Sequence, residues 1–343
     1  MNQMFHREAE RQETLIKLAA APAELRRKLI EEYKRRSEKA FAPETLRNYR
    51  QINRGFDEWC ADRGHSSIPP VSPSVVAEYV DWLGGRIRHT TIQTRLWAIG
   101  EKHRSHFQVS PCRHRLVELA LRSVKRKYGT ATRQAAPLGK ADVLEVIGGL
   151  GESRLDLRDA ALLWIATDSW CRASEIVAFQ VRDLCRQDDG SSLLFISRSK
   201  TDQYGQGAYA FLSERGTAAV LKWIETAELK CNDPIITKSQ RCARIQSLNP
   251  ATLSRVFKKR FRRNDVSAHS TRVGGVQDAF RIGCDVASIM VAGRWTSPEM
   301  PAQYGRKILA SQSAAARVSK AFALELEIDR AEVIDPQSLP RLR

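Results

Sequence analysis

Residues 129–137 (GTATRQAAP) carry no apolar periodicity, and they separate two parts of the chain in which apolar residues recur at helical spacing. The spacing is clear in residues 49–59 before this stretch and in residues 157–165 after it. A run of small and polar residues between two periodic segments is typical of a linker. At about 100–200 residues per domain, the length also favours two domains.

One region has a clear strand pattern. Residues 193–197 (LLFIS) and 207–212 (GAYAFL) flank a polar turn, which is typical of a β-hairpin. The sequence therefore predicts a mainly α protein with an all-helical first domain and a mostly helical second domain that holds a small antiparallel β-sheet.

The expected organisation is an N-terminal extension that is partly helical or mobile (1–40), a helical domain (41–128), the linker (129–137), a second domain (138–310), and a C-terminal helix with its tail (311–343). In this C-terminal helix Ala314, Val318 and Phe322 share one face. That apolar face must pack on its own domain or on another surface.

The chain carries 56 Lys and Arg against 39 Asp and Glu, a formal net charge of +17. Basic residues concentrate in residues 104–127 and 241–263, on predicted helices of the first and second domain. A charge run is often only a solvated helix face, but two such faces beside a linker suit a clamp around duplex DNA. Nucleic acid is the favoured partner, and an acidic membrane surface is the main alternative.

Other classes are disfavoured. The longest apolar run, residues 160–166, is far shorter than the roughly 20 residues of a membrane span. The N-terminus has charges of both signs and no apolar core of a signal peptide. The seven cysteines are scattered without a CxxC pair, which argues against a zinc ribbon or a disulfide framework and predicts a cytoplasmic protein. No GxxxxGK[ST] loop for nucleotide phosphates is present.

Two segments of the second domain each contain an arginine that can bind a phosphate. Arg172 and Glu175 lie in CRASEI, and a guanidinium there can hold two phosphate oxygens in its planar fork. A buried Arg172–Glu175 ion pair explains the same segment equally well. His269 and Arg272 lie three residues apart, so on a helix both side chains point to one face and can meet one anion.

Three more residues complete the set. Trp295 follows Gly293-Arg294, and Tyr304 comes nine residues later. Lys200 lies in the turn of the predicted hairpin. Taken singly, Tyr304 is explained by packing at a core or its rim, and Lys200 by an exposed turn.

Taken together, in their order and spacing, these segments resemble the tyrosine recombinase/integrase family. The matching segments are CRASEI, RSKT, AHSTRVGG and GRWTSPEMPAQYG, and Trp295 stands where Cre-type recombinases have tryptophan and most of the family has histidine. FAPETLRNYR and TIQTRL extend a weaker resemblance into the first domain, to cover most of residues 41–310. Two departures are Ala268, in place of the common glycine before His269, and the divergent residues 298–303.

The resemblance implies a chemistry that needs no metal, ATP or other cofactor. It makes Tyr304 the nucleophile, which forms a 3′-phosphotyrosyl bond with DNA and frees a 5′-hydroxyl. It further implies these roles: Arg172 and Arg272 neutralise transition-state charge, Lys200 is the general acid, His269 is a base or hydrogen-bond donor, Glu175 orients His269 or Arg172, and Trp295 offers its indole N–H to phosphate.

The resemblance also implies partners. The expected substrate is double-stranded DNA with an inverted-repeat recombination site, held by a homotetramer through a four-way junction, and the protein is expected to be nucleoid-associated when bound. The C-terminal helix is expected to dock on a neighbouring protomer. The residues expected to contact DNA are Arg47, Asn48, Arg54, Thr94 and Arg95 in the first domain and Lys258 and Lys259 in the second.

Three alternatives stay open at this point. A type IB topoisomerase or a telomere resolvase uses similar chemistry, and a sequence-specific DNA-binding protein without catalysis uses none. Relaxation of supercoils without a specific site indicates a topoisomerase, and a footprint without a covalent adduct indicates a binding protein.

Overall fold

The computed structural model describes residues 22–131, 134–198, 205–238 and 245–332, the last nine of these by their backbone alone. The chain divides into two compact units, Met1–Thr132 and Arg133–Arg343. The division falls inside residues 129–137, the stretch predicted to be a linker.

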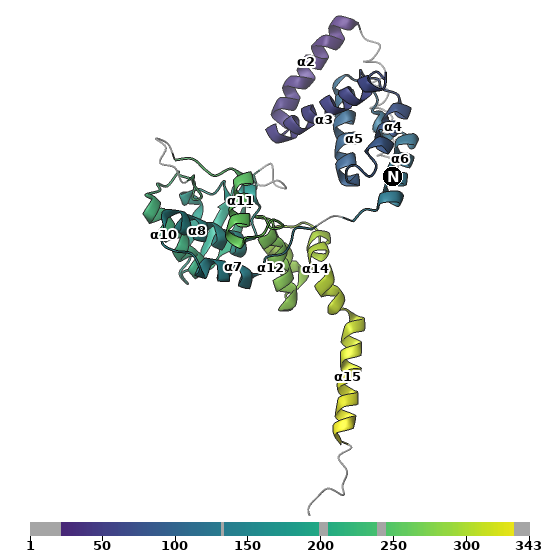
Figure 1. Cartoon of the computed structure of the whole chain (residues 1–343). Coiled ribbons are helices and arrows are strands. Elements are labelled where there is room, and N and C mark those ends of the chain that lie inside the picture. Colours follow the sequence, from purple (N-terminus) through teal and green to yellow (C-terminus); the bar gives the residue numbers. More distant parts are fainter. Residues whose placement is uncertain (1–21, 132–133, 199–204, 239–244, 333–343) are drawn as a thin grey trace, which may run out of the picture. The chain divides into compact units, whose positions relative to one another are not determined.

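The first unit is helical in every element described (Figure 1). Aromatic and branched side chains at helical spacing make its core, where Phe56, Trp59, Tyr79 and Ile92 are buried. The elements are α2 (Ala23–Ala40), α3 (Pro43–Asp62), α4 (Pro73–Leu83), α5 (His89–Ser105), the 3-10 helix η1 (Pro111–Arg113) and α6 (Arg115–Tyr128). Helix α3 packs on α5, and α4 packs on α6.

His103 is fully buried at the end of α5 and joins two segments of this unit. Its Nδ1 lies 2.8 Å from the carbonyl of Ile99, and its Nε2 lies 3.1 Å from the amide nitrogen of Val71. Because the Val71 N–H must donate, Nε2 must be an acceptor and the imidazole must be neutral. Burial accordingly lowers the pKa of His103.

We therefore expect the first unit to lose stability in acid. The unfolded chain binds a proton at His103 near pH 6.5, whereas the folded chain binds it only at lower pH. The stabilisation is thus complete above pH 6.5 and is lost as the pH falls below it. Hydrogen exchange of the Val71 amide, corrected for intrinsic rates, should show weaker protection at pH 5.5 than at pH 7, and His103→Gln should flatten this difference. Equal protection at both pH values contradicts the prediction.

The second unit is mostly helical around a small sheet. Its elements are α7 (Lys140–Gly148), α8 (Arg154–Ser169), α9 (Ala173–Ile176), η2 (Val181–Asp183), β1 (Leu184–Arg186), β2 (Ser192–Ile196), β3 (Ala208–Leu212), α10 (Glu214–Ala227), α11 (Pro250–Phe261), α12 (Ser270–Arg281), α13 (Val286–Gly293), α14 (Glu299–Ser311) and α15 (Ala314–Glu332). Helix α10 runs along the buried α8 (Figure 1).

The three strands form one antiparallel sheet in the order β1-β2-β3. Leu194 at its centre pairs with Leu184 on one side and with Ala210 on the other. Alternate residues of β2 and β3, such as Leu194 and Leu212, are buried in the main core. The structure confirms the predicted mainly α fold and its hairpin. It adds β1, whose three residues are too short for an alternating pattern.

Helix α11 carries part of the basic cluster of residues 241–263, but one of its arginines has a structural role. The guanidinium of Arg260 lies 2.7 Å from Asp156 and 2.6 Å from Asp159, both on α8, and its side chain is only 19% exposed. Arg263 pairs with Asp265 at 2.9 Å. The interpretation of this cluster as one solvated basic face is therefore wrong at Arg260, because the fold supplies acids that the local sequence lacks. No helix in the described ranges is long and apolar enough to cross a membrane.

Candidate active site

Six of the seven residues predicted to form the catalytic set meet in the second unit. Arg172 is the N-cap of the short helix α9 and Glu175 lies within it; His269 is the N-cap of α12 and Arg272 lies in its first turn. Trp295 comes two residues after α13, and Tyr304 lies on α14. The seventh, Lys200, lies outside the described residues.

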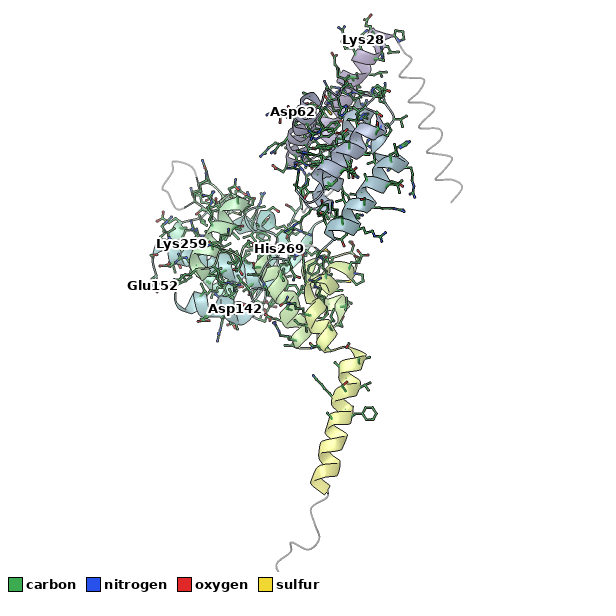
Figure 2. The ribbon with its side chains drawn as sticks, turned by 45° about the vertical axis from the view of Figure 1, so that its right-hand side comes forward. Lys28, Asp62, Asp142, Glu152, Lys259 and His269 are labelled. Carbon is green, nitrogen blue, oxygen red and sulfur yellow. The ribbon has the colours of Figure 1, made fainter. Side chains whose placement is uncertain are left out.

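The hydroxyl of Tyr304 lies 2.9 Å from Nε2 of His269 (His269 is labelled in Figure 2). The two rings are nearly perpendicular, with centroids 5.6 Å apart, and the ring of Trp295 packs edge-on against Tyr304 at 5.9 Å. Burial and the charges of Arg272 and Arg172 lower the pKa of His269, and burial raises the pKa of Tyr304. Near neutral pH a neutral imidazole therefore faces a protonated phenol, the pairing that a general base needs.

Arg272 is held rigidly. Its side chain is 1% exposed, its Nη1 donates to the carbonyl of Trp170 at 2.6 Å, and its Nη2 donates to the carbonyl of Gly293. The guanidinium also lies 4.2 Å above the ring of Trp295. Burial lowers the pKa of Arg272 to about 10, and the charges of Arg172 and Arg294 act in the same direction. The residue stays cationic at pH 7, and an anion bound beside it relieves this repulsion.

Glu175 is the one carboxylate that faces these cations among the residues described. Its side chain is 1% exposed, and it accepts from Nη1 of Arg172 at 2.6 Å and from the Arg172 amide at 2.9 Å. Burial raises the pKa of Glu175, but the hydrogen bonds from Arg172 and the charge of Arg294 lower it more. Of the two roles expected for Glu175, these contacts fit orientation of Arg172. The Arg172–Glu175 ion pair, which the sequence analysis gave as the alternative to phosphate binding, is therefore present. The side chain of Arg172 is still 21% exposed.

Glycines let the aromatic rings approach the backbone. A Cβ on Gly293 would lie 1.7 Å from the ring of Trp295, and a Cβ on Gly305 would lie 2.3 Å from the ring of Phe280. Any larger residue at either position would displace the ring. The small apolar cluster that supports Trp295 and Tyr304 therefore depends on both glycines.

Three residues of the site were not identified from the sequence. The Tyr304 carbonyl lies 3.2 Å from Nε2 of Gln277 and 3.3 Å from Nε2 of Gln134. Arg294 lies in the GRW segment, and its guanidinium reaches Glu175 at 3.0 Å. The only local sequence signal for Arg294 as a site residue is its place directly before Trp295. Its partner Glu175 is 119 residues away in the chain, so their contact leaves no local pattern.

Four of the residues expected to read DNA line one groove of the first unit. This groove, about 710 Å³ in volume, lies between α3 and α5 and includes Asn48, Arg54, Thr94 and Arg95. Arg95 is partly buried and donates to the hydroxyl of Tyr79 at 2.7 Å. The fifth residue, Arg47, is not among the lining residues and forms an exposed ion pair with Glu44.

Lys258 and Lys259 are both exposed on α11 of the second unit (Lys259 is labelled in Figure 2). Neither has a salt bridge among the described residues. In the same ranges, no group of three or more His, Cys, Asp or Glu side chains is placed to hold a metal ion.

The comparison with known proteins gives a consistent result. No family model matches the sequence. The chain is 29% identical over 289 residues to the integrase/recombinase xerD homolog of Selenomonas ruminantium, covering 79% of this chain and 84% of that protein. It is 27% identical over 325 residues to the recombinase cre of Escherichia phage P1, covering 87% of this chain and 94% of that protein.

Solved structures share the fold. The Tn1549 transposon integrase in complex with transposon right end DNA matches 80% of this chain and 94% of its own, with a TM-score of 0.59 at 11% identity. A lambda integrase dimer bound to a core site matches 80% of this chain and 93% of its own, with a TM-score of 0.55 at 14% identity. The catalytic segments and the two relatives agree: the chain is similar in sequence to tyrosine recombinases over most of its length, and the solved structures show that it shares their fold.

Proposed function

We propose that this protein is a site-specific DNA recombinase that cuts and rejoins DNA through a covalent bond between Tyr304 and a DNA phosphate. The observation that carries this proposal is the Tyr304 hydroxyl, which lies 2.9 Å from the neutral His269 and within the electrostatic influence of Arg272 and Arg172. A weak oxygen nucleophile, a base and two cations are the parts that attack on a phosphodiester requires.

In the cleavage step the Tyr304 oxygen attacks phosphorus while its proton passes to Nε2 of His269. The bond from phosphorus to the 5′-oxygen breaks, which leaves a 3′-phosphotyrosyl bond and a 5′-hydroxyl. Lys200 is proposed to protonate the leaving oxygen. One phosphodiester replaces another, so a 5′-hydroxyl from a second duplex can reverse the step and complete the exchange.

The two arginines act on the charge that grows on the phosphate oxygens. Arg272 is fixed by two backbone carbonyls and by Trp295, so it does not reorganise when the charge develops. Arg172 is more exposed. Its Nη1 pairs with Glu175, and the other N–H groups of its planar guanidinium can donate to the phosphate.

The test is trapping of the covalent intermediate. The target site is sought as inverted repeats around a short spacer in the DNA that flanks the gene. A suicide substrate of that site, nicked so that the cut strand diffuses away, should form a denaturant-resistant adduct at Tyr304. A specific footprint without an adduct would identify a binding protein, and supercoil relaxation without any specific site would identify a topoisomerase.

Lys258 and Lys259 are proposed to contact the DNA backbone. Replacing both with alanine should weaken binding to all sequences alike and reduce the salt slope by about one per lost phosphate contact. Lys222→Ala is the matched control, because this exposed lysine already pairs with Glu152 at 2.8 Å. Titrations at several salt concentrations test this, and a changed site preference with an unchanged slope would place these lysines at base edges instead.

The C-terminal helix is proposed to hold a homotetramer together on DNA. Val318 and Phe322 of α15 are 55% and 61% exposed within the single chain. An apolar helix face without cover favours a partner, and docking onto the next protomer in a cyclic order gives a closed assembly.

Truncation after Ala310 should therefore leave a protein that binds one half-site but has lost cooperative binding and recombination. Phe322→Ala should reproduce a milder form of this defect. Band shifts on half and full sites, together with a thermal melt, measure both effects. A truncated protein that unfolds or loses half-site binding would show that α15 belongs to its own core.

A further inference from the structure

Arg294 occupies a backbone position that favours glycine. Helix α13 ends with two reversed hydrogen bonds, from the Trp295 amide to the Met290 carbonyl at 3.0 Å and from the Arg294 amide to the Val291 carbonyl at 3.1 Å. This is the Schellman pattern, in which the residue after the helix is left-handed and most often glycine. Arg294 has φ +55°, which is unfavourable for any residue with a Cβ. Contacts of the Arg294 side chain must offset the energetic cost of this backbone conformation.

The guanidinium of Arg294 contacts the segment that leads into Arg172. It donates to the carbonyls of Ser169 at 3.2 Å and Trp170 at 3.4 Å, and it lies 3.4 Å from Sγ of Cys171. It also donates to the carbonyl of Ala292 beside it at 3.1 Å. The side chain is 11% exposed, and its Nε is buried without a hydrogen-bond partner among the described residues.

The same guanidinium occupies one oxygen of Glu175. Nη2 of Arg294 lies 3.0 Å from Oε2, while Nη1 of Arg172 lies 2.6 Å from Oε1. The buried carboxylate is thus shared between two cations. Oε2 also accepts from the Arg172 amide at 2.9 Å. Without Arg294, the whole charge of the carboxylate would act on Arg172 and would draw its guanidinium closer to Glu175.

We propose that Arg294 is a positioning residue that keeps Arg172 available to the scissile phosphate. It does so by neutralising Glu175 and by holding the turn of residues 169–171. Both terminal nitrogens of Arg294 are already held by backbone carbonyls or by Glu175, so Arg294 acts through Arg172. This inference rests on the proposed function, because it concerns the same phosphate pocket.

The test compares Arg294→Met and Arg294→Gly, each with and without Glu175→Gln. Glycine suits the left-handed backbone, so the second variant keeps the fold if methionine does not. At saturating DNA, each single variant at position 294 should form the adduct about tenfold more slowly, with half-site affinity unchanged. Adding Glu175→Gln should restore most of the rate, because a neutral amide no longer draws in Arg172. Arg281→Met, which removes an exposed arginine paired with Asp278, is the control.

Binding of inorganic phosphate, measured by calorimetry, gives a readout that does not depend on cleavage. Phosphate should bind the variants at position 294 more weakly than the wild type and regain affinity with Glu175→Gln. The proposal is overturned if adduct formation and phosphate binding match the wild type, or if Glu175→Gln restores neither. A wild type that binds phosphate but forms no adduct would contradict the proposed function alone, and phosphate binding would still decide the role of Arg294.

Discussion

Tyr304→Phe is expected to abolish covalent DNA–protein adducts on a suicide substrate while half-site binding stays nearly intact. The substitution removes only the hydroxyl that lies 2.9 Å from His269. The ring keeps its edge-on contact with Trp295, so the pocket should retain its shape. Without a nucleophilic oxygen no phosphotyrosyl bond can form, and the loss should be complete within the limit of the gel assay.

Tyr209→Phe is the matched control for this experiment. Tyr209 lies on β3 and is 58% exposed, so its hydroxyl can be removed without disturbing the site. This variant should cleave as the wild type does. Adducts that persist in Tyr304→Phe would show that another residue is the nucleophile.

Arg172→Lys is expected to reduce cleavage far more than DNA affinity. Lysine keeps the positive charge but lacks the planar fork, so it cannot hold Glu175 and a phosphate oxygen at the same time. Loss of one such transition-state donor costs about 3–4 kcal/mol, or roughly 10²–10³-fold in rate.

Single-turnover cleavage at saturating DNA, beside half-site titrations, separates the two effects of Arg172→Lys. Arg281→Lys makes the same exchange at an exposed ion pair and should leave both unchanged. Equal losses in affinity and cleavage for Arg172→Lys would make Arg172 a ground-state anchor.

The secondary structure was largely predictable because its signals are local. The spacing of Ile52, Phe56 and Trp59 marks α3, and all three side chains are buried. The apolar residues of 193–197 and 207–212, on either side of a polar turn, mark the hairpin of β2 and β3. Strand β1 escaped prediction because Leu184–Arg186 is defined by its pairing with β2 and not by its own pattern.

The electrostatics were less predictable. Residues 241–263 contain no acid, yet Arg260 is neutralised by Asp159, which is 101 residues away in the chain. The exposed Lys258 and Lys259 beside it keep the character expected for the cluster. Only the tertiary contact of α11 with the acids of α8 distinguishes the structural Arg260 from the exposed Lys258 and Lys259.

The sequence by itself determined the helical fold with its hairpin, because periodicity and apolar runs are properties of short segments, and the chain divides inside residues 129–137, the stretch predicted as a linker. Arg172, His269, Arg272, Trp295 and Tyr304 were chosen through the resemblance to a known family, and their catalytic roles stay predictions. Tertiary structure alone decided how these groups meet. It set the contact of Tyr304 with His269, the burial that lowers one pKa and raises the other, and the entry of Arg294 between Glu175 and the turn before Arg172. Hydrogen bonds and pKa values depend on atoms brought close by folding, and in this site those atoms come from segments up to 170 residues apart.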